Sequence, residues 1–338
     1  MSPPGRKYVD HPSLQVFPPP SLCQDVNLSV FFLKGRQDRL QALCDRFLNA
    51  PSGGAVHYRP RLPFVMLTFQ HVGRLSSEAE GFRDWGSTSE REVTFWIAAS
   101  DTRRHGPDEL CQRVELFVPY IYTDNPWAVA GGREIYGFPK QAADIRMPGT
   151  GQGAGAFEVR TLAYRTLSPG TRAEVARLLL LERADGQPMD RDLDMGVSPD
   201  ADGAGGFRAE NLLQQVGVLR DELGSLLDFN FEVGSRILDF LFRPTLPMVF
   251  LKQFRGVGTR TDACYQAIVG AEADQLKLRG LRLLPRRFRL TLDSLATQPL
   301  AEDLGLELNS RGQLSIAGGL QIQFDFRINE GHLIWSGS

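Results

Sequence analysis

Apolar residues recur at helical spacing in one segment near the start of the chain. In RQDRLQALCDRFLNA (36–50) they stand three and four positions apart, and Pro51, Gly53 and Gly54 follow. This spacing places side chains on one face of an α-helix. It predicts an amphipathic helix that ends near residue 50 and packs against the rest of the protein through Leu40, Leu43, Cys44, Phe47 and Leu48.

Most other apolar positions fall in short segments rich in β-branched and aromatic residues. Gly, Pro and Ser separate these segments, which is typical of the strands of a sandwich or barrel. Helical periodicity returns between residues 210 and 241, and Pro244 ends it. We therefore predict an α+β fold that is mainly β. The predicted strands span residues 28–34, 63–69, 92–99, 113–122, 156–164, 247–254, 263–269, 282–292 and 313–328.

Two polar stretches interrupt this pattern. Residues 1–22 are rich in proline and predict an extended N-terminal arm. Residues 185–206 form a Gly/Asp-rich loop, longer than is usual inside a compact domain. A chain of 338 residues can form one large domain or two smaller ones. We expect a single domain over residues 23–338 that carries this loop and the helical segment 210–241 as additions.

Composition narrows the classes of function. The net charge of -2 and the 23% of charged residues argue against nucleic acid or an anionic membrane surface as the main partner. No apolar run approaches the roughly 20 residues of a membrane span, and the first residues lack the apolar core of a signal peptide. A cytoplasmic protein with reduced thiols is expected, because no pair of its cysteines has C-x-x-C spacing. These are Cys23, Cys44, Cys111 and Cys264.

Metal and nucleotide motifs are missing or incomplete. The acidic run at Asp190, Asp192 and Asp194 lacks the glycine and the glutamate of an EF-hand. GTGQGAG (149–155) has Ala154 at the third glycine position of a dinucleotide loop. The five histidines show no ligand spacing. We therefore predict no metal and no separate cofactor.

Lys140 stands out because it ends the apolar, turn-rich segment GREIYGFPK, which begins at Gly132. A lysine in this setting is either a solvated ammonium or a nucleophile whose pKa the fold has lowered. Only the free amine attacks a ketone, so a nucleophilic lysine needs burial or a nearby positive charge. Tyr136, Phe138 and Pro139 are expected to form an apolar wall beside it.

The segment around Lys140 resembles the acetoacetate decarboxylase family. Its members carry an acidic or Asn-rich turn, then Ala-Gly-Arg-Glu, an aromatic residue, Pro and the Schiff-base lysine. The matching positions are Asp124-Asn125, residues 130–134, Phe138, Pro139 and Lys140. EVTFWIAA (92–99) and VFLKQFRG (249–256) are similar to two further strands of the family. The resemblance implies a closed β-barrel or sheet core with peripheral helices, a covalent imine on Lys140 and a homo-oligomer.

One position departs from the family pattern. Decarboxylases of the family usually carry a second lysine directly after the nucleophile, and that cation is credited with lowering the pKa. Here Gln141 takes this place. Activation of Lys140 would then rest on burial or on another cation such as Arg36 or Lys252. Together with the length of the chain, this indicates a divergent branch of the family, whose relatives with altered sites resemble Schiff-base aldolase-dehydratases or decarboxylases of larger keto acids.

The other candidate catalytic and substrate-binding residues are expected to lie near Lys140. Glu92 is the expected acid-base or orienting carboxylate, and Glu90, two residues earlier on the same face of a strand, is the alternative. Arg133 is either a carboxylate-binding residue or a structural partner of Glu134. The resemblance implies a substrate-binding set of Arg133, Glu134, Tyr136, Phe138, Gln141, Tyr122 and Arg36.

The predicted function is Schiff-base chemistry on a small keto acid. Decarboxylation of a β-keto acid is the leading reaction, and an aldol condensation of the pyruvate type, followed by dehydration, is the alternative. A ligand-binding protein or a cyclase that forms no imine remains a second alternative, in which Lys140 is only a charge.

Overall fold

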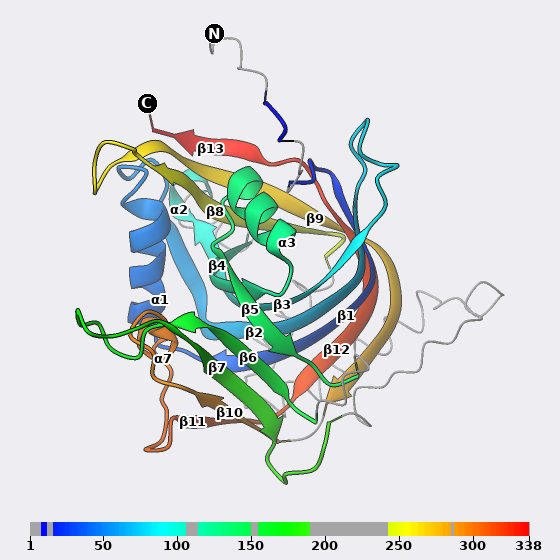
Figure 1. Cartoon of the computed structure of the whole chain (residues 1–338), viewed down its shortest axis with the longest axis vertical. Coiled ribbons are helices and arrows are strands. Elements are labelled where there is room, and N and C mark those ends of the chain that lie inside the picture. The colour runs from blue at the N-terminus through cyan, green and yellow to red at the C-terminus, as the bar shows by residue number, and fades with distance from the viewer. Residues whose placement is uncertain are drawn as a thin grey trace, which may run out of the picture.

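The computed structural model describes residues 8–11, 16–105, 114–149, 155–189, 243–284 and 287–337. The predicted helical segment 210–241, Cys111 and residues 190–206 of the predicted loop lie outside the described residues. Within them the protein is mainly β, with short helices around one large mixed sheet (Figure 1). The predicted fold class is therefore confirmed.

Seven strands pair side by side into a closed ring. In Figure 1, β1, β2, β3, β12 and β9 curve together around its interior. Neighbours in the ring run antiparallel, except that β4 and β8 pair in parallel through Leu116 with Met248 and Phe117 with Val249. Each strand thus has a partner on both sides. In ring order the strands are β1 (Ser21–Lys34), β2 (Tyr58–Ser77), β3 (Thr88–Asp101), β4 (Glu115–Thr123), β8 (Thr245–Arg255), β9 (Ala263–Leu284) and β12 (Gly319–Ile328).

A second run of strands leaves the ring at β4. The end of β4 pairs in parallel with β5 (Lys140–Arg146), and Ile121 lies opposite Lys140. Lys140 is thus the first residue of the strand that leaves the ring. The sheet continues antiparallel through β6 (Phe157–Ala163), β7 (Glu174–Arg183), β10 (Phe288–Leu292) and β11 (Gln313–Ile316), while β13 (His332–Ser336) pairs with β9.

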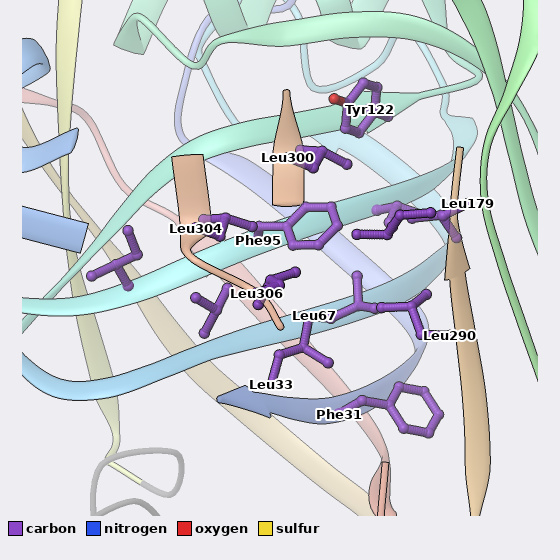
Figure 2. Packing of buried hydrophobic residues seen from close by; sticks show 14 of the residues in the cluster. Phe31, Leu33, Leu67, Phe95, Tyr122, Leu179, Leu290, Leu300, Leu304 and Leu306 are labelled. Carbon is purple, nitrogen blue, oxygen red and sulfur yellow. The ribbon is translucent and has the colours of Figure 1, made fainter. Parts of the chain in front are cut away.

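Because side chains alternate along a strand, the ring strands have two apolar faces. In β1, Phe31 and Leu33 belong to an outer core, which lies between the ring and the second run of strands. Figure 2 shows them near Leu67 and Leu290. The helices that bound this core or lie elsewhere at the edge of the sheet are α1 (Gln37–Cys44), the π-helical turn η1 (Asp45–Asn49), α2 (Thr102–His105), α3 (Pro126–Gly131), the π-helical turn η2 (Gly132–Tyr136) and α7 (Leu300–Leu304).

The opposite face of the ring strands forms an inner core. Val30, Phe32 and Met66 belong to it, together with residues of β4, β8, β9, β12 and η2. Since no residue of the second run of strands joins this cluster among the described residues, the inner core lies inside the ring. It does not fill the ring completely, and the cavity described below occupies the rest.

The predicted elements agree with the structure in most places. α1 and η1 confirm the helix predicted at 36–50, and each predicted strand overlaps an observed one. The prediction missed β5, β7 and β13. It was wrong about 282–292 as one strand, because β9 ends at Leu284 and β10 begins at Phe288. It was also wrong about 313–328, because β11 ends at Ile316 and β12 begins at Gly319. In the described part of the chain, no helix has the length and hydropathy of a membrane span.

Candidate active site

A cavity of about 170 Å³ lies inside the ring. It is lined by side chains of the inner core and by a smaller group of polar residues from β1, β2, β3, β5 and β9. Lys140, Glu90 and Glu92 belong to this group. Their exposed fractions are 5%, 6% and 8%, so the three charged groups are almost completely removed from solvent. Buried charged groups are stable only when groups of opposite charge or hydrogen-bonding groups lie next to them.

The amine of Lys140 contacts both carboxylates. Its Nζ lies 2.7 Å from Oε2 of Glu92 and 3.4 Å from Oε2 of Glu90. Each carboxylate also accepts a hydrogen bond from a threonine: Thr94 donates to Glu92 at 3.1 Å, and Thr123 donates to Glu90 at 3.2 Å. These contacts hold both carboxylates toward the same amine.

The pKa of Lys140 reflects two opposing effects. Burial by itself would lower it, but the negative charges of Glu90 and Glu92 outweigh burial and hold the pKa above its ordinary value. Burial raises the pKa of Glu90, although Lys140 acts in the other direction. The expectation that the fold lowers the pKa of Lys140 is therefore wrong for this cavity, because two carboxylates lie within reach of the amine.

The segment before Lys140 is held by a capped helix. The side chain of Asn125 accepts hydrogen bonds from the backbone N–H groups of Trp127 and Ala128 at the start of α3. Its amide also donates to the backbone oxygen of Ser89 at 3.0 Å, which ties α3 to the β3 strand that carries both glutamates. The Asp-Asn turn identified in the sequence thus has a structural role.

Two positions of the segment GREIYGFPK require glycine, because other atoms of the protein lie too close to leave room for a side chain. A Cβ on Gly132 would lie 3.0 Å from Cδ of Lys140 and 3.2 Å from the ring of Phe138. Gly137 has φ of 85°, and a Cβ there would lie 2.5 Å from Cα of Lys252 in β8. The first glycine makes room for the lysine side chain, and the second lets the turn pack on β8.

Two of the predicted substrate-binding residues line the cavity. Tyr136 and Phe138 stack with ring centroids 4.9 Å apart, and Phe138 also packs on Phe250. Nζ of Lys140 lies 5.8 Å from the centroid of the Phe138 ring. These aromatic rings form two parts of the apolar wall expected beside the lysine, whereas Pro139, the third expected member, does not line the cavity.

Arg133 and Glu134 belong to the outside of this turn and not to the cavity lining. Arg133 is exposed and donates a hydrogen bond of 3.5 Å to the backbone oxygen of Lys140. Glu134 is half-buried and accepts a hydrogen bond from Tyr8, which raises the pKa of the Tyr8 phenol. This placement agrees with a structural role for Arg133. Its partner, however, is the backbone carbonyl of Lys140 and not Glu134.

Three other candidates lie away from the amine. Tyr122 donates to Gln298 at 2.7 Å, and Gln298 donates to Gln141 at 2.8 Å, so this chain of hydrogen bonds runs on the outer side of the ring. Arg36 forms an exposed ion pair of 2.8 Å with Asp38 at the start of α1. Lys252, the other cation considered for activation, is also absent from the cavity lining.

Sequence reasoning missed several residues that surround the amine. Gln70, Thr94, Cys23 and Thr123 contact the cavity or the carboxylates. Thr94 could have been found, because it shares one face of β3 with Glu90 and Glu92. Gln70 could not, because its position opposite Glu92 depends on the pairing of β2 with β3. Among the described residues, no group of three or more His, Cys, Asp or Glu side chains could hold a metal ion.

A closed ring of strands around a buried lysine and two glutamates defines a mainly β protein with an internal site. The family model described as acetoacetate decarboxylase (ADC) matches residues 16–196, more than half of the chain. The chain therefore belongs to the acetoacetate decarboxylase family, and the resemblance found in the sequence is confirmed. No curated protein matches the chain in sequence.

Solved structures show the same fold at low sequence identity. The acetoacetate decarboxylase from Legionella pneumophila has a TM-score of 0.56 and 13% identity, over 99% of this chain and 94% of that one. A second acetoacetate decarboxylase structure has a TM-score of 0.53 and 13% identity, over 98% and 96% of the two chains. At this identity the likeness establishes the fold.

Proposed function

We propose that this protein is an imine-forming lyase that decarboxylates a β-keto acid through Lys140. The observation that carries the proposal is the contact of one buried amine with two buried carboxylates inside an apolar cavity. Such a site can bind a carbonyl compound, move protons to and from it, and exclude water from the reacting atoms.

The first step is formation of the imine. When the substrate binds, Lys140 passes a proton to the Glu92 carboxylate, which lies 2.7 Å away. The free amine forms a bond to the keto carbon. The former carbonyl oxygen takes up the proton held by Glu92 and one proton from the nitrogen, and it leaves as water. The product is a protonated imine, and both glutamates return to their starting states.

The protonated imine then accepts electrons from the substrate. The bond to the carboxylate carbon breaks, carbon dioxide leaves, and the electron pair forms a neutral enamine. Once the enamine is neutral, the cation that lowers the pKa of Glu90 is gone, and burial, which raises that pKa, favours uptake of one proton from solvent by this carboxylate. Glu90 is assigned the donor of this proton to the enamine carbon. Addition of water to the resulting imine releases the ketone and restores Lys140.

Charge favours decarboxylation over aldol condensation of a pyruvate-type substrate. Lys140 is the single cationic side chain in the cavity lining among the described residues, and it already faces two carboxylates. A pyruvate-derived imine keeps its carboxylate throughout the reaction and would need a further cation. A β-keto acid loses its negative charge as carbon dioxide, which suits an apolar cavity.

Borohydride trapping tests the imine. The full-length protein, incubated with acetoacetate and sodium borohydride, is expected to gain the mass of the reduced adduct at Lys140, as read by peptide mass spectrometry. Lys140→Ala should abolish the adduct, while Lys252→Ala, which removes a half-buried lysine outside the cavity lining, should keep it. An unmodified Lys140 across a panel of keto acids would overturn the proposal.

Release of carbon dioxide separates the remaining alternatives. An adduct with release identifies the decarboxylase, whereas an adduct without release, together with condensation of pyruvate and an aldehyde, identifies the aldolase-dehydratase. Binding of keto acids without an adduct identifies the ligand-binding alternative. We also propose that residues 23–338 form a single catalytic domain and that the protein is cytoplasmic. Because members of the family form homo-oligomers, we propose the same for this protein, and light scattering of the purified protein measures the number of subunits.

A further inference from the structure

Gln70 is a polar residue of the cavity wall that has no role in the reaction steps above. It lines the cavity from β2 and lies directly opposite Glu92 of β3. Residues in such positions on antiparallel strands have their Cβ atoms about 4.5–5.5 Å apart. Side chains alternate along β2, and the next residue back, Phe69, belongs to the outer core. The amide of Gln70 therefore points into the space beside the ion pair of Lys140 and Glu92.

This amide is available to a ligand. In the part of the chain that the structure describes, the side chain of Gln70 forms no hydrogen bond with another protein group, and it is half-buried. Polar groups removed from bulk water ordinarily have partners inside the protein. The two N–H donors of Gln70 can therefore bind an anion or a carbonyl group that enters the cavity.

Other neutral polar side chains that β2 and β3 contribute to the wall are less suited to this task. Thr68 and Trp96 are paired with each other, because the Trp96 indole donates a hydrogen bond of 3.2 Å to the Thr68 hydroxyl. Thr88 precedes Glu92 by four residues, which is roughly 13 Å along the strand. Of these groups, Gln70 is both unpaired and close to the reacting amine.

The carboxylate of a keto acid must lie in the same cavity as the imine. An apolar cavity of about 150 Å³ holds a benzene ring, and this cavity has about 170 Å³ in all. A molecule of the size of acetoacetate is therefore enclosed as a whole. Its carboxylate needs a hydrogen-bond donor there, because most of the wall is apolar and the nitrogen of Lys140 is taken up by the imine.

We propose that Gln70 binds the carboxylate of the keto acid and orients it for the loss of carbon dioxide. The bond that breaks must stand across the plane of the protonated imine, so that its electron pair passes into the C=N bond and forms the enamine. An amide that donates to the carboxylate oxygens keeps this bond at the required angle. The assignment of this positioning residue rests on the imine chemistry proposed above and extends it.

A neutral donor favours this step more than a cation would. The negative charge of the carboxylate disappears as carbon dioxide forms, so a cation here would stabilise the starting state more than the transition state. The amide directs the carboxylate through weaker hydrogen bonds. In addition, a carboxylate bound by Gln70 is repelled by the nearby charge of Glu92, and this repulsion ends when neutral carbon dioxide leaves.

The mass of the trapped adduct tests the assignment. With acetoacetate, borohydride traps either an adduct at Lys140 that still carries the carboxyl group or one that has lost carbon dioxide, and peptide mass spectrometry separates the two. Gln70→Met keeps an unbranched side chain but removes the donors. It should slow carbon dioxide release about 10²-fold and raise the ratio of the intact to the decarboxylated adduct at least about tenfold over the natural protein.

Acetone and a matched variant separate positioning of the carboxylate from a structural role. Acetone has the keto group but no carboxylate, so its rate of trapping in Gln70→Met should stay within about twofold of that in the natural protein. Gln323→Met changes a half-buried glutamine of β12 outside the cavity lining and should keep both rates and the adduct ratio. Equal losses for acetone and acetoacetate in Gln70→Met, or an unchanged adduct ratio, would overturn the assignment.

Failure of this inference can be told from failure of the proposed function. If the natural protein gives an adduct and carbon dioxide and Gln70→Met does so equally well, the imine chemistry stands and the role of Gln70 is wrong. If the natural protein gives no adduct at Lys140, or an adduct without release of carbon dioxide, both are wrong. The ratio of two adducts does not depend on the amount of folded variant, so partial loss of folding does not obscure the result.

Discussion

Gln141 follows Lys140 in the chain, but its side chain lies on the opposite face of β5, where it accepts a hydrogen bond of 2.8 Å from Gln298. The position that carries a second lysine in the family pattern is therefore separated from the amine by the strand itself. A charge at this position would face Tyr122 and Gln298 in the outer core, and not the cavity.

We therefore expect Gln141→Lys to leave the pH dependence of imine trapping at Lys140 unchanged. It should instead lower the free energy of unfolding by about 1–3 kcal/mol, because the partner amide of Gln298 loses its acceptor. Trapping at a series of pH values and urea denaturation measure the two effects. A trapping profile displaced to lower pH, with stability intact, would show that residue 141 does act on the amine.

The nearest carboxylate is expected to control the ionisation of the amine. Glu90 and Glu92 together hold the pKa of Lys140 above its ordinary value, so Glu92→Gln should lower that pKa. Because trapping needs the free amine, its rate should reach half of its maximum at a lower pH than in the natural protein. Decarboxylation should nevertheless slow by about 10²-fold, since a positioned acid-base group is lost.

Glu115→Gln provides the control for this substitution. Glu115 is also a buried glutamate of the ring, but it does not line the cavity. The trapping profile of this control should match that of the natural protein. A profile that shifts equally in both variants would mean that the effect comes from the general loss of a buried charge.

Glu90 is expected to make stability depend on pH. Its pKa is raised from 4.5 by burial, so the folded protein keeps a proton that the unfolded chain releases above about that pH. The folded state then binds more protons, and the free energy of unfolding falls as the pH rises from 4.5 to the folded pKa. Glu90→Gln should flatten this decline, as measured by urea denaturation between pH 4 and 8. Equal slopes in the two proteins would exclude Glu90 as the cause.

The fold and the centre of the site could be predicted because their signals are local. Period-two alternation identifies strands, and it also places Glu90 and Glu92 on one face. The direction of the lysine pKa could not be predicted in this way. It depends on the contact of Lys140 with Glu90, fifty positions away in sequence, and on the pairing of strands that no local pattern encodes.

The position of Tyr122 could not be predicted from the sequence either, because a β-bulge in β4 changes which side chains face the cavity. Leu116 and Val118 line the cavity, so strict alternation would also turn Tyr122 toward it. However, β4 gains one residue against β3 between the pairs Ile97 with Phe117 and Phe95 with Tyr120. Beyond this bulge the faces exchange, so that Ile121 lies inside and Tyr122 outside. A single extra residue therefore removes a candidate from the site.

Room for the lysine side chain is expected to depend on Gly132. An alanine there would place Cβ within 3.0 Å of Cδ and 3.3 Å of Cε of Lys140, so the amine must move from its place between the carboxylates. Gly132→Ala should slow trapping by about 10²-fold. In the adjacent control, Gly131→Ala, the nearest side-chain contact is Val16 at 3.7 Å, and the rate should change about twofold or less. Similar losses in both variants would contradict the role of Gly132.

Gly137 should contribute to stability through packing as well as backbone conformation. Gly137 and Gly81 have nearly the same φ, 85° and 81°, but a Cβ on Gly137 would lie 2.5 Å from Cα of Lys252, whereas one on Gly81 meets nothing within 4 Å. Gly81→Ala should therefore lower the free energy of unfolding by about 1–2 kcal/mol, which is the cost of the left-handed backbone conformation for alanine. Gly137→Ala should lose clearly more or fail to fold, because the turn before Lys140 must separate from β8. Urea denaturation of the two variants measures the difference, and equal losses would mean that the turn can move away from β8 at no cost.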